Sequence, residues 1–451
     1  METRKIKGIW WIDNNPEFQL NGILEFHSPK NCYLILDGSF SERNLELIKG
    51  FSSKGKSITL YKCFQTNLSE SFPGLSTSKY YVNYAFINVD YKTTEDITFK
   101  NFSVNFSSLD EWANISGFKI VNEHKKKSVK VIYKKPKDVI IYQDNRFKIC
   151  LSVTSNGPQI NSVQKDVSIN QTTFFNVAFK VSEEKLSKVI KISSILQNFL
   201  TFAVSKPVKV ISLIGQSDKS ITSFEDITFN NNIDILYTSI TQDLDVSYLD
   251  PHFMLFTYPD IKSKSQSLLK KWFQKSETLD PVFSLYFSTL YKIDTFLNLR
   301  FLSLVQAIEA YHRRTTTNVE IDIREHNKRL NEIFSNVSKK HNVWLEQKLK
   351  YSNEPSLRQR LKSIFNKYNI ILTPLINKTT FINDVVNTRN YNVHYDEQLK
   401  DNAKRGKELL KICDVLKVII ELCFLTEMGF SETQYSPLIE KSYAYKNITN
   451  T

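Results

Sequence analysis

The chain has 451 residues, 41% of them hydrophobic and 13% aromatic, so it can bury the cores of two or three domains and is not a disordered protein. Lys and Arg number 60 against 47 Asp and Glu, and the net charge of +13 favours a polyanionic partner. Five scattered cysteines without a CxxC pair argue against a zinc site or a disulfide framework. We expect reduced, buried thiols in a cytoplasmic protein with neither a signal peptide nor a membrane span.

Short runs of aromatic and β-branched residues, separated by turn formers, predict strands over about the first 180 residues. The expected strands include 33–36, 57–61, 80–89, 97–106, 129–133, 139–142, 147–153 and 174–181. Many short strands at close spacing predict an antiparallel sandwich or barrel-like domain. A helix over 183–202 and a last strand over 208–214 are expected to follow.

Residues 50–57, with the sequence GFSSKGKS, match the phosphate-binding pattern GxxxxGK[ST]. A working loop of this kind follows a strand and opens a helix, whose N-terminus helps to hold the phosphates. Here we expect a helical turn before the match, over 45–49, and a strand after it. We therefore interpret the match as a basic turn and not as a nucleotide site.

The densest positive patch is His124-Lys125-Lys126-Lys127, followed by Lys130, Lys134, Lys135 and Lys137. Such a patch could contact nucleic acid. The favoured alternative is a solvated hairpin, in which lysines keep an edge strand soluble and unpaired.

The chain changes character after residue 215, because nine of its eleven glycines lie at or before that position. Pro251, Pro259 and the polar run 262–267 indicate a connecting region, and Asp280-Pro281 is expected to cap a helix. We therefore divide the chain into a β-rich part, 1–279, and a helical part, 280–451. The expected helices are 282–290, 295–314, 321–337, 342–350, 357–366, 379–395 and 403–428, the last closed by Gly429.

The most informative stretch is Asn387 to Asp396, NTRNYNVHYD, in which Arg389 and His394 lie five residues apart. Arginine presents a permanent charge and a planar fork of donors to phosphate, and histidine exchanges a proton near neutral pH. On a helix, Asn390 and His394 share a face with Arg389 beside them, so the three side chains could converge on one phosphodiester. The spacing alone also describes an ordinary surface helix.

The stretch 389–396, together with RFLSLVQAIEAYHR at 300–313, resembles the HEPN domain of the ApeA family of bacterial anti-phage proteins. The segments GIWW at 8–11 and LNGIL at 20–24 resemble the N-terminal domain of that family. The resemblance implies an α+β protein with two domains: an antiparallel β-rich, sandwich-like sensor or regulatory domain, then an all-α HEPN helical bundle. It also implies abortive infection, in which the protein cuts host or phage RNA after an unknown phage-derived trigger is sensed.

The resemblance further implies a metal-independent endoribonuclease without a cofactor, whose site forms where two protomers meet. We therefore expect a homodimer or a higher even oligomer. The Arg and His of the family fall on Arg389 and His394, with Asn390 as the polar residue that follows the arginine. RNA carries its own nucleophile, the 2′-hydroxyl, so proton transfer by His394 and charge stabilisation by Arg389 suffice. Nearby carboxylates form no spaced acidic cluster, so chelators should leave activity intact.

Glu309, His312 and Arg313 are possible supporting residues on the earlier helix. Glu309 and Arg313 have the spacing of a helix-stabilising ion pair, whereas the resemblance suggests that Glu309 or His312 orients His394 or Arg389. Two other functions remain open. The helical part could be a noncatalytic RNA-binding or dimerisation module, or the β-rich part could bind a ligand while the helices form an oligomerisation stalk.

Overall fold

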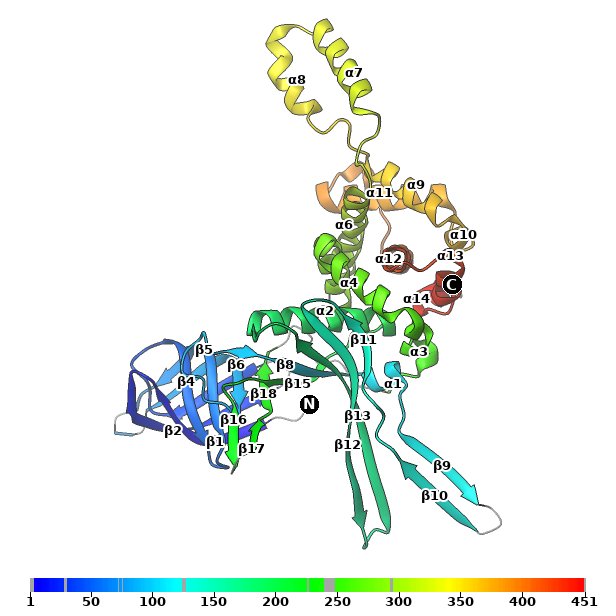
Figure 1. Ribbon diagram of the computed structural model, residues 1–451. Helices are drawn as coiled ribbons and strands as arrows, with labels where there is room; N and C mark the ends of the chain where they lie inside the picture. The colour runs from blue at the N-terminus through cyan, green and yellow to red at the C-terminus, as the bar shows by residue number, and fades with distance from the viewer. Residues whose placement is uncertain are drawn as a thin grey trace. The chain divides into compact units, whose positions relative to one another are not determined.

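The computed structural model describes residues 4–27, 31–71, 73–74, 76–123, 127–224, 227–238, 248–292 and 295–449 (Figure 1). The chain forms two compact units, Met1–Lys270 and Lys271–Thr451. The first unit contains the β-sheets and the second contains only helices and turns among its described residues. The predicted fold class, an antiparallel β-rich domain followed by a helical domain, is confirmed.

Six antiparallel strands close into a barrel at the start of the N-terminal unit. They are β1 (Arg4–Ile12), β2 (Asn15–His27), β3 (Asn31–Asp37), β4 (Asn44–Ser52), β5 (Ser57–Ser69) and β6 (Thr77–Ile87). Alternation of buried and exposed residues directs one face of each strand inward, as in β3, where Cys32, Leu34 and Leu36 are buried. Closure by the β5–β6 pairing leaves these strands without a free long edge.

Trp10 fills the barrel core and explains one of the glycines. Its side chain is fully buried, and a Cβ built on Gly50 would lie 2.2 Å from Cε3 of its ring. Only glycine therefore fits at position 50. The phosphate-binding pattern match begins at this residue, so its first glycine serves packing of the barrel.

An open sheet continues from β6 through β18, β15, β8, β13 and β12 to β11. Its strands are β8 (Asn101–Phe106), β11 (Val139–Gln143), β12 (Phe147–Asn161), β13 (Asp166–Phe179), β15 (Val210–Gln216) and β18 (Ile233–Tyr237), with the short pair β7 (Thr98–Phe99) and β14 (Glu184–Lys185) beside it. Helices α1 (Leu109–Ala113) and α2 (Leu186–Val204) pack with this sheet. Trp112 is buried there between Phe175 and Phe199.

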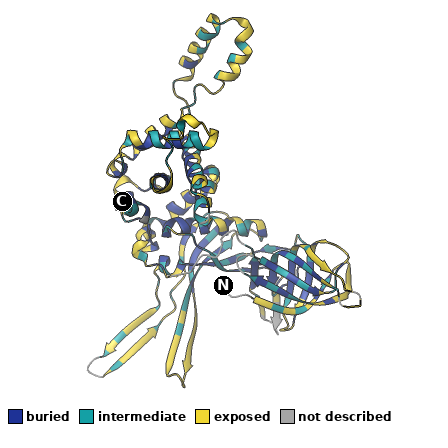
Figure 2. Cartoon of the chain, turned by 180° about the vertical axis from the view of Figure 1, so that it is seen from behind, coloured by how far each residue is buried: buried dark blue, intermediate teal, exposed yellow. Residues whose placement is uncertain are grey.

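Two hairpins extend beyond this core with most of their residues exposed (Figure 2). One is β9 (Phe118–Glu123) with β10 (Ser128–Tyr133), and the other is the outer half of β12 and β13. A further short pair is β16 (Ile221–Phe224) with β17 (Ile227–Asn230). The basic patch lies on β9–β10, where Lys130 pairs with Glu123 at 2.6 Å, while His124, Lys125 and Lys126 lie outside the described residues. The predicted hairpin is confirmed, and the contact of its lysines with nucleic acid stays an open alternative.

The remaining helices begin near the end of the N-terminal unit and fill the C-terminal one. They are α3 (Tyr258–Ile261), α4 (Ser265–Thr278), α5 (Asp280–Tyr291), α6 (Leu297–Thr315), α7 (Ile323–Asn336), α8 (Asn342–Leu349), α9 (Leu357–Lys367), α10 (Asn369–Leu372), α11 (Lys378–His394), α12 (Gly406–Met428), α13 (Glu432–Glu440) and α14 (Tyr443–Thr449). Short 3-10 turns are η2 (Pro251–Phe253), η3 (Lys262–Lys264), η4 (Lys339–His341) and η5 (Glu397–Leu399). Helix α12 is the centre of the bundle, because it is buried along most of its length.

Aromatic rings pack against α12 and hold the first helices of the unit to it. Phe424 contacts Trp272, Phe283 and Tyr286, with ring centroids 6.0, 4.7 and 5.3 Å apart. Edge-to-face contacts of this kind add to the burial of their large apolar surfaces. The buried Tyr286 hydroxyl donates to Oε1 of the Glu421 carboxylate at 3.0 Å, so the core also contains a polar contact.

Several local predictions need correction. Residues 45–49 are strand β4 and not a helical turn, because their buried side chains complete the barrel. The phosphate-binding match is the β4–β5 hairpin turn, so its interpretation as a turn holds. Asp280 lies in the first turn of α5 and Leu279 occupies the cap position, whereas the polar run 262–267 is helical and not a linker. Helices α10, α13 and α14 were not predicted.

Other features agree with the sequence. Gly429 ends α12 with a left-handed φ of 94°, as predicted for a glycine C-cap. All five cysteines are free and buried. Within the described part of the chain, no helix combines the length and apolarity needed to cross a bilayer.

Candidate functional site

Helix α11 carries the Arg-Asn-His motif on its outer side. The Asn377 side chain accepts a hydrogen bond from the Thr380 amide at 3.1 Å and starts the helix. Tyr395 ends it directly after His394, with a left-handed φ of 52°. The buried face of α11 consists of Phe381, Ile382, Val385 and Thr388. Because these residues fix the helix against the bundle, the motif stands at its end, away from the core.

The three motif side chains differ in how they are held. Arg389 is half-buried, and its Nη1 donates to Oδ1 of the half-buried Asn390 at 3.1 Å. His394 is exposed at the last position of the helix. Among the described residues, Arg389 and His394 make no contact with each other. One chain therefore supplies a guanidinium oriented by Asn390 and a solvent-facing imidazole.

The chain after α11 folds back on the motif. Thr388 is fully buried, and its Oγ1 accepts from the Lys404 amide at 3.0 Å. Arg405 donates to the Tyr391 hydroxyl at 3.3 Å, and its guanidinium lies 5.4 Å from the centroid of that ring. These contacts bring Lys404 and Arg405 beside the motif, although the sequence contained no spacing signal that linked them to it.

A groove between α11 and the start of α12 adjoins these residues. Asp384, Lys404 and Glu408 are among its lining side chains, and Lys404 Nζ lies 3.8 Å from Asp384 and 3.6 Å from Glu408. Burial raises the pKa of Asp384, opposed by the Lys404 charge and reinforced by Glu408. In the described residues, no three His, Cys, Asp or Glu side chains are placed to hold a metal ion.

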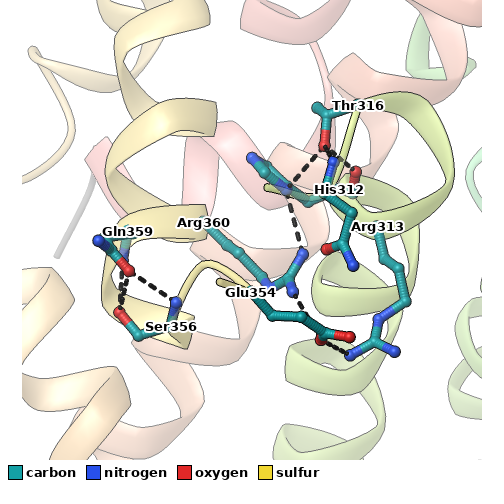
Figure 3. Close-up of polar contacts among 8 residues, drawn as sticks. His312, Arg313, Thr316, Glu354, Ser356, Gln359 and Arg360 are labelled. Atoms are coloured by element: carbon teal, nitrogen blue, oxygen red, sulfur yellow. Dashed lines mark hydrogen bonds and ion pairs between the residues drawn. The ribbon is translucent and has the colours of Figure 1, made fainter. Parts of the chain in front are cut away.

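Two of the possible supporting residues, the buried His312 and the exposed Arg313, belong to a second cluster (Figure 3). His312 on α6 is buried, and its Nδ1 lies 3.2 Å from Nη1 of the equally buried Arg360 on α9. Glu354 forms ion pairs with Arg313 and with Arg360, the latter at 3.6 Å. The contacts of His312 and Arg313 thus run to α9 and the segment before it. Within the described chain, Arg313 forms its ion pair with Glu354 and not with Glu309, which is half-buried.

The protonation of His312 follows from this environment. Burial lowers its pKa, and the neighbouring Arg360 charge lowers it further. A neutral imidazole with an unprotonated Nδ1 can accept from Arg360, while Thr316 Oγ1 lies 3.3 Å from the same nitrogen. The negative charge of Glu309 also acts on this cluster, because it favours the protonated form of Arg360.

Comparison with protein families gives two matches that together cover most of the chain. Residues 5–272, more than half of the chain, match ApeA N-terminal domain 1, and residues 302–434 match the Apea-like HEPN domain. This chain belongs to the ApeA family. Searches of curated proteins and of solved structures gave no match.

Membership of the ApeA family makes the chain a HEPN-containing anti-phage defence protein. HEPN domains generally comprise ribonucleases. Arg389, Asn390 and His394 all lie inside the HEPN match, as do the buried His312 cluster and α7 and α8. The ApeA N-terminal match ends two residues beyond the first compact unit.

Proposed function

We propose that the HEPN domain is a metal-independent endoribonuclease in which Arg389, Asn390 and His394 act on the scissile phosphodiester. The observation that carries the proposal is the placement of these residues on one end of α11. The helix is fixed by its buried face, while Arg389 is oriented by Asn390 and His394 faces solvent. Arginine and histidine are the residue types that phosphate recognition and proton transfer require.

The reaction uses the nucleophile that RNA itself supplies. A histidine takes the proton of the 2′-hydroxyl, the 2′-oxygen bonds to phosphorus, and the bond from phosphorus to the 5′-oxygen breaks. The leaving 5′-oxygen receives a proton, so the products carry a 2′,3′-cyclic phosphate and a 5′-hydroxyl. Arg389 stabilises the negative charge that develops on the phosphorane, and its bond to Asn390 limits the orientations of the guanidinium.

A symmetric homodimer would complete the site. Two copies of His394 allow one imidazole to act as base while the other acts as acid, which a single histidine cannot do in one step. The exposure of His394 at the end of α11 leaves it free to face a second chain. The N-terminal ApeA domain is then the regulator that restrains the nuclease until a phage-derived trigger is sensed, and abortive infection follows from cutting RNA.

The direct test incubates the purified full chain with end-labelled RNA, with and without EDTA. The wild type should produce 2′,3′-cyclic phosphate ends in both conditions, and His394→Ala should produce none. His252→Ala, which removes a histidine of the N-terminal unit, is the matched control and should cleave normally. Activity that EDTA abolishes and Mg²⁺ restores would contradict the metal-independent mechanism.

Mixed dimers test the shared roles of the two histidines. If one His394 acts as base and the other as acid, a heterodimer of wild type and His394→Ala should lose nearly all activity. Retention of half the wild-type rate would show that each protomer works alone. Intact RNA with measurable binding would instead favour a noncatalytic RNA-binding or dimerisation module. An undiminished phenotype in Arg389→Ala would favour a ligand-binding β domain on a helical stalk.

A further inference from the structure

Residues 317–355 form an arm, composed of α7 and α8, that leaves the helical unit after α6 and returns before α9 (Figure 1). All residues of the arm are described, and His326 is the one that is buried. The apolar side chains of α7 and α8, such as Leu330, Phe334 and Leu345, are only half-buried. The arm thus has almost no core, and most of its surface faces solvent (Figure 2).

Hydrogen bonds join the two chain segments at the base of the arm. The side chain of Asn353 joins the outgoing and returning segments of the arm. It accepts a hydrogen bond from the Ile321 amide and donates one to the Ile321 carbonyl, both at 3.1 Å. The Glu320 amide donates to the Asn353 carbonyl at 2.7 Å. Directly after it, Glu354 pairs with Arg313 and Arg360 of the bundle. We therefore expect substitutions further along the arm to leave the contacts at its base intact.

The base of the arm lies at the same end of the bundle as the Arg-Asn-His motif. Helices α9 and α11 run antiparallel, because Lys378 Nζ lies 2.5 Å from Asn366 Oδ1 at one end and Arg358 bonds to Asn383 at the other. Arg389 lies about 9 Å further along α11 than Asn383. It therefore stands at the end of the bundle where α9 starts and the arm returns. An RNA that crosses the arm can therefore continue to the motif.

One face of the arm combines aromatic rings with lysines. Lys340 in η4 and Trp344 and Lys348 in α8 recur every four residues, and Tyr351 continues the line, which we name the Trp344 stripe. All four are exposed, Trp344 by 60% and Tyr351 by 64%. In the described chain, neither lysine of the stripe forms an ion pair. Glu346 lies about 200° around α8 from Trp344, on the other side.

We propose that the Trp344 stripe binds single-stranded RNA and delivers it to the site on α11. The inference rests on the proposed function, since it names how the substrate is held. Bases stack on Trp344 and on the face of Tyr351 away from Lys350, whose Nζ lies 5.4 Å from the centroid of that ring. Lys340 and Lys348 contact the phosphates between them. A second copy of the chain fits less well, because a two-fold axis would bring together two surfaces that carry the same positive charge.

The test measures binding of a fluorescein-labelled, 20-nucleotide single-stranded RNA to the full chain carrying His394→Ala, so that cleavage does not interfere. Adding Trp344→Ala should weaken binding at least about fivefold, since a stacking platform is lost. Trp344→Phe, which keeps a ring, should restore most of the affinity. The pair Lys340→Ser and Lys348→Ser should lower the slope of log K against log salt by about 1.4. The pair Lys54→Ser and Lys56→Ser, which removes the same charge from the exposed β4–β5 turn, should leave it unchanged.

Unchanged RNA affinity in Trp344→Ala would overturn the proposal. So would a change in molar mass by sedimentation equilibrium without a change in RNA affinity, because the stripe would then join copies of the chain. The two proposals fail separately. If the wild type leaves RNA intact while Trp344→Ala still weakens binding, the nuclease fails and the stripe stands. If cleavage depends on His394 while Trp344→Ala binds normally, the stripe fails alone.

Discussion

The helical unit contains two groups of arginine and histidine that are built for opposite purposes. In the cluster at the base of the arm, His312 and Arg360 are buried, touch each other and share Glu354 with Arg313. In the motif on α11, Arg389 is half-buried, His394 is exposed and the two side chains are apart. The same residue types therefore serve packing in one place and remain open to a ligand in the other.

This difference shows how the unit separates stability from chemistry. Buried charges must be paired, so the partners in the His312 cluster are committed to each other. An exposed histidine costs little to maintain and retains the freedom to exchange a proton with a substrate. We expect changes in the cluster to reduce stability and changes in the motif to reduce cleavage.

The largest expected effect is on folding. Arg360→Met should lower the free energy of unfolding by about 3–5 kcal/mol, because it leaves Glu354 with one partner fewer and His312 without its donor. Urea denaturation of the full chain measures this. Arg358→Met, on the same helix but exposed, is the control and should cost under about 1 kcal/mol. Equal losses in both variants would remove the distinction.

Arg389→Lys should have the opposite profile. Lysine keeps the charge but loses the planar fork, so we expect the single-turnover cleavage rate to fall about 100-fold. The free energy of unfolding should stay within about 0.5 kcal/mol of the wild type. A variant that unfolds easily yet cleaves normally once folded would place Arg389 with the structural arginines.

Asn390→Ala tests the bond that orients Arg389. Loss of one hydrogen bond to the guanidinium should lower the cleavage rate about fivefold while RNA affinity is kept. Asn392→Ala is a suitable comparison, since that side chain bonds to the Thr388 carbonyl instead. An effect on affinity alone would mean that Asn390 contacts RNA directly.

The smallest effect is a dependence of stability on pH. The pKa of His312 in the folded chain is lowered by burial and by Arg360. Below about pH 6.5 the unfolded chain therefore binds a proton at this residue more readily than the folded chain does. Stability contributed by His312 is therefore complete above about pH 6.5 and is lost progressively as the pH falls from there through the lowered pKa of the folded chain. Arg313, Glu354 and Glu309 are the other charged groups of this cluster. Denaturation of His312→Gln between pH 5 and 8 should show a shallower decline, and an identical decline would contradict this assignment.

The sequence predicted elements whose signals are local. Helix α11 was expected over 379–395 and runs over Lys378–His394, since its apolar spacing and the polar residues at both ends agree. The helical turn expected at 45–49 was wrong, because the β4 pairing with β1 and β5 decides that segment and those partners are distant in sequence.

Long-range partners could not be predicted in either arginine group. Glu309 and Arg313 have the spacing of an ion pair on a helix. Arg313 instead pairs with Glu354, which lies at the returning end of the arm. Nothing in the spacing of Arg405 connected it to Tyr391, because the turn after α11 creates that contact. The motif residues were found from the family resemblance and from the i, i+4 spacing that places Asn390 and His394 on one face, and their roles remain predictions.

The proposed function requires that Arg389 and His394 cut RNA. The most direct measurement is sequencing of RNA ends from cells that express the wild-type chain or His394→Ala at equal levels, with the phage infection that would supply a trigger. We expect discrete cleavage ends with 5′-hydroxyls that appear with the wild type and vanish in the variant. The same ends at the same abundance in both would contradict it.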